Sequence, residues 1–400
     1  MTPRSFRVLV LLAPLTLSAA SKGIVLEVDS GAYDRANTPV VFQLPESLGK
    51  QQHFMLTELD TKRAVDVQVD RGRILWIIRD KLPAGQTRRY RLAAVSGKHQ
   101  PPAAVTADDD GKRLLIKIAN RTVLQYNEAI VPSPDPQKPE YRRSGYLHPV
   151  YDPDGRPVTD DMAPDHMHQH GVMFAYEKTT FESRPVNFWE PSNGSVEHEA
   201  IKSIVSGPVF AEFQPALRHK VNDAPGGPRQ ALRETWHVCV YNVTDHFLFD
   251  IESVQEAATD SPLVIEKNSY GGLAIRCHRN WFDPKNSEYL TSEGRTRKDG
   301  NQTRPRWVDL YGWIEGRISG VAILDHPGNL QFPQPVRLHP EKPYLCFAPM
   351  ALGPFRIEPG KALTSRYRFY IHTGKPETGK IEAAWHDYSE PPQVRVISGN

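Results

Sequence analysis

Three histidines within seven residues are the strongest chemical signal in this sequence. The segment DHMHQHG, residues 165–171, places His166, His168 and His170 two residues apart behind Asp165, in a chain with 15 histidines among 400 residues. Residues two apart lie on the same face of an extended strand, so a strand here would turn all three imidazoles one way. We predict these four residues to be catalytic, with an imidazole as general base or acid near its ordinary pKa of about 6.5.

A row of imidazoles on one strand face can also begin a metal shell. Two such histidines need only one or two further ligands to hold zinc, iron or manganese. The predicted ligands of a divalent transition metal are His148, His166, His168 and His198. The carboxylates that could complete this shell are Asp165, Glu190 and Glu197. A third interpretation is a polar turn in which each ring merely holds a backbone carbonyl.

A second candidate is the alternating segment YGGLAIRCHRNWF, residues 270–282, which places Arg276, His278 and Asn280 on one face. Arg276 is predicted to act in catalysis and substrate binding, and His278 to bind substrate beside it. A guanidinium can grip a carboxylate or sugar hydroxyls with a forked pair of hydrogen bonds. The alternative is an ordinary exposed strand face.

Aromatic and turn residues could complete a sugar site. Trp189 and Trp313 are predicted to stack on sugar rings, although aromatic side chains also fill cores. The turn DHPGN supplies further predicted binding residues, which are Asp325, His326 and Asn329. Polar residues at such a place are often turn formers instead. Glu234 is a candidate general base, with a surface position as the alternative.

The elements that must position these residues are strands. Alternation of apolar and polar residues recurs along the chain, for example at Leu114, Ile116 and Ile118 and again in SRYRFYIH, residues 365–372. This period of two is typical of half-buried strands, and Gly-containing turn pairs separate them. The sequence therefore predicts an all-β protein with stacked sheets.

Composition shifts suggest the boundaries of the units. Over residues 94–112, glycine, proline and charged residues replace the alternation of apolar and polar residues. We therefore predict a small β-sandwich or barrel over residues 24–100 and a large sheet-on-sheet body over residues 105–380. Residues 381–400 are predicted to be a loose C-terminal tail with one short helical stretch. Two long segments without pattern, residues 127–168 and 281–306, are of the length that is often functional.

The N-terminus has the pattern of a secretory signal over residues 1–20. Arg4 and Arg7 precede an apolar run that ends in small residues, which predicts export to the periplasm or the cell exterior. That run is too short to cross a membrane as a helix, and no later stretch is long and apolar enough. The three cysteines are predicted to be buried free thiols.

Charge and missing motifs exclude several classes of function. A formal net charge of +2, from 49 basic and 47 acidic residues, gives no electrostatic footprint for nucleic acid. There is no phosphate-binding glycine loop, no Gly-x-Ser-x-Gly elbow and no zinc-protease helix motif. We therefore expect no nucleotide or flavin cofactor.

Longer motifs resemble a known family. The stretch from RRSGYLHPVYDPDG through DHMHQHGVMFAYEKTTF, followed by SYGGLAIR, GVAILDHPGN and PGKALTSRYRFYIHTGK, is similar to the bacterial PmoA-like, or methane-oxygenase-like, family of unassigned function. The resemblance spans residues 24–375. It implies a β-supersandwich of the galactose-mutarotase type and a role in carbohydrate breakdown. Relatives often have adjacent histidines where this chain has Gln169, a poor metal ligand.

Two main functions follow from these features. The first is an exported enzyme with lyase, epimerase or hydrolase chemistry on an acidic or oxidised sugar, at a histidine-rich site that works with or without a bound metal. The second is a non-catalytic periplasmic sugar-binding protein. Redox chemistry at a copper or iron centre, as the family label suggests, is a further alternative.

Overall fold

The computed structural model describes residues 23–49, 51–95 and 102–399. About 50% of the chain is strand and 7% is helix, so the predicted all-β class is confirmed. The predicted signal segment, residues 1–20, lies outside the described residues. Within the described part of the chain, no helix is both long and apolar enough to span a membrane.

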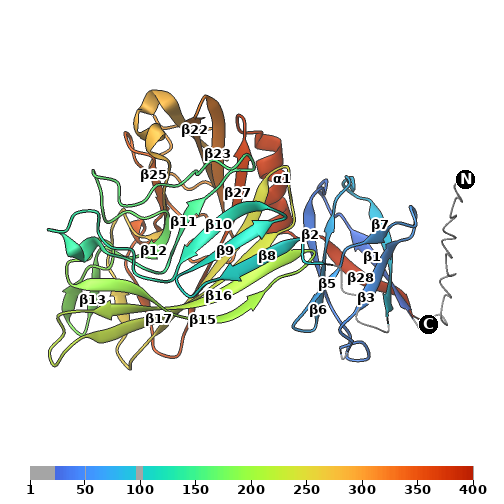
Figure 1. Ribbon diagram of the computed structural model, residues 1–400, viewed down its shortest axis with the longest axis horizontal. Coiled ribbons are helices and arrows are strands. Elements are labelled where there is room, and N and C mark those ends of the chain that lie inside the picture. The colour runs from blue at the N-terminus through green and yellow to red at the C-terminus, as the bar shows by residue number, and fades with distance from the viewer. Residues whose placement is uncertain (1–22, 50, 96–101, 400) are drawn as a thin grey trace, which may run out of the picture.

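The N-terminal unit is a small sandwich of two sheets (Figure 1). Leu26, Trp76 and Tyr90 are fully buried between them. The five-stranded sheet has the order β28 (Gln393–Gly399), β1 (Gly23–Asp29), β7 (Thr87–Ala94), β3 (Phe54–Glu58) and β4 (Ala64–Val65). The three-stranded sheet has the order β2 (Thr38–Gln43), β6 (Arg73–Ile78) and β5 (Gln68–Asp70).

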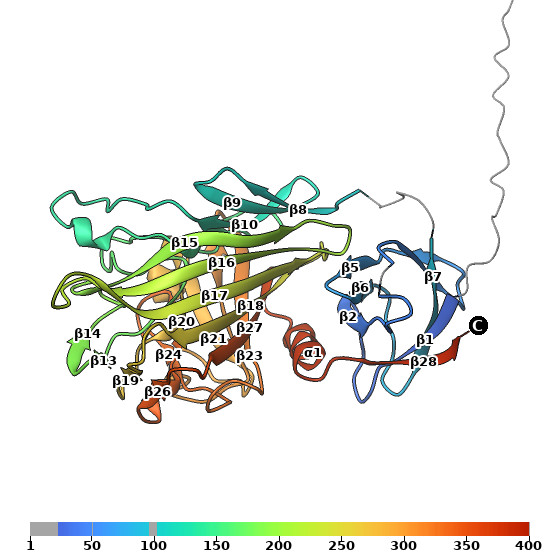
Figure 2. The same ribbon diagram turned by 90° about the horizontal axis from the view of Figure 1, so that it is seen from below.

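The C-terminal segment contains the predicted helical stretch but is not a loose tail, so only that second part of the prediction is wrong. Helix α1 (Thr378–Ser389) lies between the two units, and β28 then pairs antiparallel with β1 (Figure 2). Ile381 and Trp385 of the helix are buried against both units, together with Ile77 of β6. Asp387 forms a buried ion pair with Arg35 at 2.8 Å. Apolar burial and this ion pair therefore fix the segment in place.

The large unit stacks two eight-stranded antiparallel sheets over one core. The first sheet has the order β24 (Val336–Leu338), β25 (Tyr344–Phe347), β20 (Gly272–Arg276), β12 (Val172–Ala175), β11 (Tyr146–Val150), β10 (Arg121–Asn127), β9 (Arg113–Ile118) and β8 (Val105–Asp109). The second has the order β15 (Gly194–Val205), β16 (Phe210–Val221), β17 (Arg229–Tyr241), β18 (Phe247–Ala257), β27 (Leu363–Thr373), β23 (Arg317–Asp325), β22 (Trp307–Ile314) and β21 (Ser287–Thr291).

Alternation places the core residues as expected. Leu114, Ile116 and Ile118 of β9 are buried in the same cluster as Phe369 of β27. A four-stranded sheet continues the sandwich at one end, with the order β14 (Arg184–Val186), β13 (Thr179–Phe181), β19 (Leu263–Ile265) and β26 (Phe355–Ile357). All three cysteines are free: Cys277 and Cys346 are buried as predicted, whereas Cys239 is half-buried.

The long segment between β10 and β12 carries the histidine-rich stretch, residues 165–171, and His148. It contains β11 and is closed at its start by a bridge between Val131 and Arg143, whose backbone N–H groups each donate to the other's carbonyl, at 2.8 and 3.1 Å. Beyond β11 it continues as turns to residue 171. The neighbouring strand β20 ends at Arg276, which brings a residue 111 positions away from Asp165 against these turns.

Candidate acid/base site

The histidine segment is a pair of turns and not a strand. The backbone N–H of His166 donates to Ala163 at 2.9 Å, and that of Gln169 donates to His166 at 2.9 Å. Strand β12 begins only at Val172. Pro164 and Asp165, both typical turn residues, form the first turn and favour it over an extended conformation. The prediction that three imidazoles line one strand face is therefore wrong.

Arg276 grips the protein's own carboxylate. Its Nη2 donates to Asp165 Oδ1 at 2.8 Å, and its Nη1 donates to Asp165 Oδ2 at 3.2 Å and to Gln169 Oε1 at 2.9 Å. The Arg276 side chain is 1% exposed. Gln169 is also buried, and its hydrogen bond to Arg276 anchors this loop. Its role is therefore structural, whereas the sequence had suggested a poor metal ligand. Both terminal nitrogens of the guanidinium are thus occupied within the chain.

His166 and His168 lie at the rim of this ion pair. His166 Nδ1 is 2.9 Å from Asp165 Oδ2 and 3.0 Å from Lys342 Nζ. The His168 ring is 5.3 Å from that of His166 and 6.5 Å from that of Trp189. Burial lowers the pKa of His168 to about 4, and neighbouring His166 adds to the effect, so His168 is neutral at pH 7.

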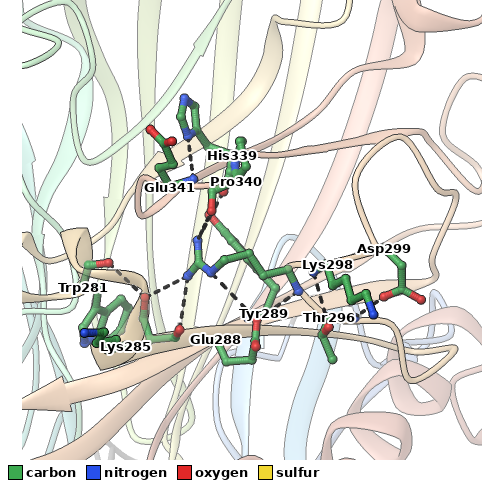
Figure 3. A network of polar contacts seen from close by, with 12 residues as sticks. Trp281, Lys285, Glu288, Tyr289, Thr296, Lys298, Asp299, His339, Pro340 and Glu341 are labelled. Carbon is green, nitrogen blue, oxygen red and sulfur yellow. Dashed lines mark hydrogen bonds and ion pairs between the residues drawn. The ribbon is translucent and has the colours of Figure 1, made fainter.

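Hydrogen bonds hold the segment before Lys342, and Figure 3 shows His339 and Pro340 in one polar network with Tyr289. Arg297 Nη1 donates to the carbonyl oxygen of His339 at 3.2 Å, and its guanidinium lies 4.5 Å from the centre of the Tyr289 ring. The Tyr289 hydroxyl in turn donates to the carbonyl oxygen of Lys342 at 2.8 Å. His339 Nδ1 accepts from the backbone N–H of Lys342 at 3.0 Å.

The predicted metal ligands are not brought together. His148 Nδ1 is 2.9 Å from Thr159 Oγ1, and His198 Nδ1 is 2.9 Å from the Tyr126 hydroxyl. The ammonium group beside His166 Nδ1 would also repel a cation. Within the described ranges, no three His, Cys, Asp or Glu side chains are arranged to hold a metal ion. The residues present do not fit the predicted metal shell.

His170 points away from this rim and forms a polar chain in the interior. Its Nδ1 donates to Asp161 Oδ1 at 2.7 Å, and the Tyr146 hydroxyl donates to Asp161 Oδ2 at 2.6 Å. A hydrogen bond from Nδ1 assigns the proton to that nitrogen, which leaves Nε2 with its lone pair. The imidazole is therefore oriented as a base, with its tautomer set by Asp161.

The charges and pKa values of the polar chain formed by His170, Asp161 and Tyr146 suit proton transfer. Burial lowers the pKa of His170, against the opposing hydrogen bond to Asp161. Burial would raise the pKa of Asp161, but its hydrogen bonds with His170 and Tyr146 outweigh this and hold the pKa below its usual value. Burial raises the pKa of Tyr146 strongly. At pH 7 the chain is consequently a neutral imidazole, a carboxylate and a neutral phenol.

His170 lines a cavity of about 180 Å³. Arg143 lines the same cavity, and Ser192, Ser195 and Asn222 supply further polar groups. Asp161 lines a second, more open cavity of about 700 Å³ beside Met162 and Arg279. The first volume is below the roughly 300–1,000 Å³ of drug-sized sites, so it suits one small ligand or one sugar ring.

Several other predicted residues lie outside this cavity. Trp189 is 3% exposed and packs beside Tyr344, which leaves it no face for stacking, whereas Trp313 is 50% exposed on β22. His278 Nδ1 accepts from the backbone N–H of Asn280 and so caps a 3-10 helix, Arg279–Phe282.

The DHPGN turn forms a structural network against α1. Asp325 is buried and accepts from Asn329 Nδ2 at 2.7 Å and from the backbone N–H of Gln334 at 2.8 Å. Its carbonyl oxygen accepts from Trp385 Nε1 at 2.9 Å. The His326 ring packs edge-on against Tyr388 at 4.9 Å. These contacts place the turn among core-fixing residues and not in the cavity of His170.

The predicted glutamates have other surroundings. Glu234 is buried rather than exposed, and accepts from Trp236 Nε1 at 2.7 Å and from the Ser253 hydroxyl at 2.6 Å. Glu197 lines the cavity of His170 but is paired with Lys220 at 2.6 Å. Glu190 is exposed and has no part in the cavity lining.

Sequence reasoning missed Asp161, Tyr146 and Arg143. The pair Asp160-Asp161 and the aromatic hydroxyl of GYLHP flank the histidine segment in sequence, and this was the available signal. Only the fold brings them to His170, because β11 and the turns before β12 run side by side.

Fold and site together define an all-β sandwich protein with an aspartate-oriented histidine at a cavity that opens to the surface. Residues 113–386 match the model of a family described as "Family of unknown function (DUF6807)", so the chain belongs to that family. The predicted PmoA-like family gave no match, while the prediction of a family without assigned function is confirmed. No curated protein matches the chain in sequence.

Solved structures resemble the chain only distantly. An alpha-mannosidase from Enterococcus faecalis V583 has a TM-score of 0.43 and 11% identity over 95% of this chain and 47% of its own. A GH36 alpha-galactosidase from Geobacillus stearothermophilus has a TM-score of 0.36 and 11% identity over 68% of this chain and 41% of its own. The chain thus spans less than half the length of either structure, and neither bears on the chemistry of the site.

Proposed function

We propose that this protein is an exported carbohydrate-processing enzyme that transfers a proton through His170. The observation that carries the proposal is the His170–Asp161 hydrogen bond of 2.7 Å at a cavity that Arg143 also lines. A neutral imidazole with its proton fixed on Nδ1 is a base at Nε2. A nearby guanidinium can stabilise negative charge that develops on an oxygen of the substrate.

Epimerase and lyase chemistry suit this arrangement best. His170 Nε2 would take the proton from a carbon next to a carbonyl or carboxylate, and the electron pair of that bond would move to the oxygen as an enolate. Return of a proton to the other face of the carbon gives epimerisation. Expulsion of a β-alkoxide, which takes up a proton, gives a lyase product. The imidazolium formed in the first step is stabilised by the Asp161 carboxylate.

The carbohydrate and export parts of the proposal have separate support. The resemblance to galactose-mutarotase-type sandwiches, in the motifs quoted above, favours a sugar substrate. The pattern of residues 1–20 favours export. The relation to PmoA-like proteins stays a prediction on the same motifs.

Exchange of the substrate proton with solvent tests the proposal. Purified protein would be incubated in D2O with a panel of methyl uronides and keto-sugar glycosides, and deuterium uptake would be followed by NMR and mass. We expect uptake at the carbon next to the acid or ketone, and a loss of about 10²–10⁴-fold in His170→Gln, as for removal of a general base. His237→Gln is the matched control, since His237 lies on β17 at a different hollow with Arg71 and Tyr388. Uptake from no member of the panel, or full uptake with His170→Gln, would refute the proposal.

A further inference from the structure

Arg143 is a buried guanidinium without a carboxylate partner. The structure describes four buried arginines, which are Arg35, Arg143, Arg276 and Arg368. The other three pair with Asp387, Asp165 and Asp250 at 2.7–2.8 Å. Arg143 is 6% exposed, and no carboxylate of the described chain lies within ion-pair distance of it.

The hydrogen bonds of Arg143 are as sparse as its ion pairs. Among the described residues, its guanidinium makes one weak hydrogen bond, from Nη2 to the carbonyl oxygen of Phe174 at 3.4 Å. Its Nε is buried with no acceptor. An unpaired buried charge costs far more free energy than an exposed one, so a site of this kind favours an anion that supplies the missing partner.

The carboxylates near Arg143 form no ion pair with it in the described chain. Glu140 and Glu197 line the same cavity, and Glu197 is paired with Lys220 at 2.6 Å. Burial lowers the pKa of Arg143 to about 10, so the guanidinium still carries its charge at pH 7. The two carboxylates that act on it from a distance are Glu234 and Asp161. Glu234 accepts from Trp236 and Ser253, and Asp161 accepts from His170 and Tyr146. Their oxygens are directed to these donors, so the fork of Arg143 is open for a ligand.

The cavity has room and polar groups for a sugar. It measures about 180 Å³, or roughly six times the volume that one water molecule occupies in the liquid. Ser192, Ser195 and Asn222 line it with hydroxyl and amide groups that can bond sugar hydroxyls. His170 lines the same cavity, so a ring held at Arg143 lies in a space that His170 borders.

From this geometry we infer that the cavity binds a uronic acid residue, with its carboxylate on the guanidinium of Arg143. The inference rests on the proposed function and names its substrate class. The carbon that carries the carboxylate is the carbon whose proton is acidic. Anchoring the carboxylate at Arg143 therefore presents that proton to the cavity of His170, and Arg143 stabilises the enolate that forms. Arg143, and not Arg276, selects the acidic sugar.

Binding measured by calorimetry tests this inference without requiring turnover. The probes are methyl α-D-galacturonide and methyl α-D-glucuronide, each paired with its neutral methyl hexoside, and acetate. We expect wild-type protein to bind one uronide at least tenfold more tightly than the matching hexoside, as for a charge-assisted fork. Arg143→Gln should lose that preference, and Arg143→Lys should keep part of it, because a lysine retains the charge but not the fork.

Controls separate this inference from the proposed function. Arg356→Gln, at an exposed arginine of β26 that pairs with Glu358, should leave the preference unchanged. His170→Gln should keep uronide binding while it loses deuterium exchange. Uronide binding that depends on Arg143 in a protein without exchange would refute the proposed function and leave this inference standing.

Three results would overturn the inference. These are equal affinity of wild-type protein for uronide and hexoside, no binding of either uronide, and a full uronide preference in Arg143→Gln. Acetate binding as tight as uronide binding would overturn the sugar part. If Arg143→Gln fails to fold by circular dichroism, the wild-type comparison and Arg143→Lys decide.

Discussion

Replacement of Asp161 by asparagine removes one charge from the polar chain with almost no change in shape. In the structure Asp161 accepts from both His170 Nδ1 and the Tyr146 hydroxyl. The asparagine oxygen can still accept from Tyr146, but its amide nitrogen then faces His170 Nδ1 as a donor. We expect the imidazole proton to move to Nε2, which removes the lone pair from the cavity.

The size of the effect follows from the lost hydrogen bond. A hydrogen bond to a charged group contributes about 1.5–3 kcal/mol, and one pKa unit corresponds to about 1.4 kcal/mol. Burial already lowers the pKa of His170, and Asp161 is the main group that opposes this. Asp161→Asn should therefore lower the pKa of His170 further and reduce deuterium exchange by about 10²–10⁴-fold.

Nitrogen NMR of histidine-labelled protein reports both changes without a substrate. The wild-type His170 signals should show a protonated Nδ1 and an unprotonated Nε2, and Asp161→Asn should show the reverse. Asp160→Asn is the matched control, because Asp160 is the adjacent aspartate and pairs with Arg279 at 2.6 Å instead of with His170. An unchanged tautomer and pKa of His170 in Asp161→Asn would refute the assignment of the base.

Other consequences concern the loop and the pH. Gln169→Ala should destabilise the protein by about 1–3 kcal/mol in urea unfolding, more than His166→Ala, because it removes the acceptor that lies 2.9 Å from the buried Arg276 Nη1; the opposite order would contradict the anchor role. Arg276→Ala should cost about 1.5–3 kcal/mol by the same measurement, since Asp165 loses its two hydrogen bonds to the guanidinium and keeps only His166 and Lys342 as partners; a cost below about 1 kcal/mol would contradict this. Folded-state pKa values of His168 and His170 lie below 6.5, so their contribution to stability is complete above pH 6.5 and is lost as pH falls, through about 4 for His168; melting temperatures that stay flat from pH 7.5 to 4 would contradict it. For the same reason exchange activity should persist below pH 6.5 and fall only as His170 becomes protonated.

The fold was predicted well where the alternation of apolar and polar residues along a strand reports its burial. The buried residues of β9 follow from alternation, because a strand with one face in the core needs it. Strand β27 has buried residues on both faces, including Arg368 and Tyr370, which alternation did not predict. The pairing of β28 with β1 joins residues such as Val28 and Val394, and a contact across that much sequence leaves no local trace. The packing of α1 against both units explains why a helix at the chain end is ordered.

The site was harder to predict because the sequence shows the residue types but not how they are arranged in space. The spacing of His166, His168 and His170 fits one strand face only if the segment is extended, and Pro164 and Asp165 already favoured a turn. The forked partner expected for Arg276 exists, but it is Asp165 of the same chain. The arginine that does lack a partner, Arg143, has no distinguishing motif and stands out only by burial.

A crystal structure of the His170→Gln variant with methyl α-D-galacturonide or the glucuronide bound tests the central claim most directly. The account predicts the sugar carboxylate about 2.7–2.9 Å from Arg143 nitrogens. It also predicts the adjoining carbon about 3–3.5 Å from the place that Nε2 of His170 occupies in the native protein. A uronide bound at the Asp165–Lys342 rim or in the cavity beside Met162, with Arg143 still unpaired, would contradict it.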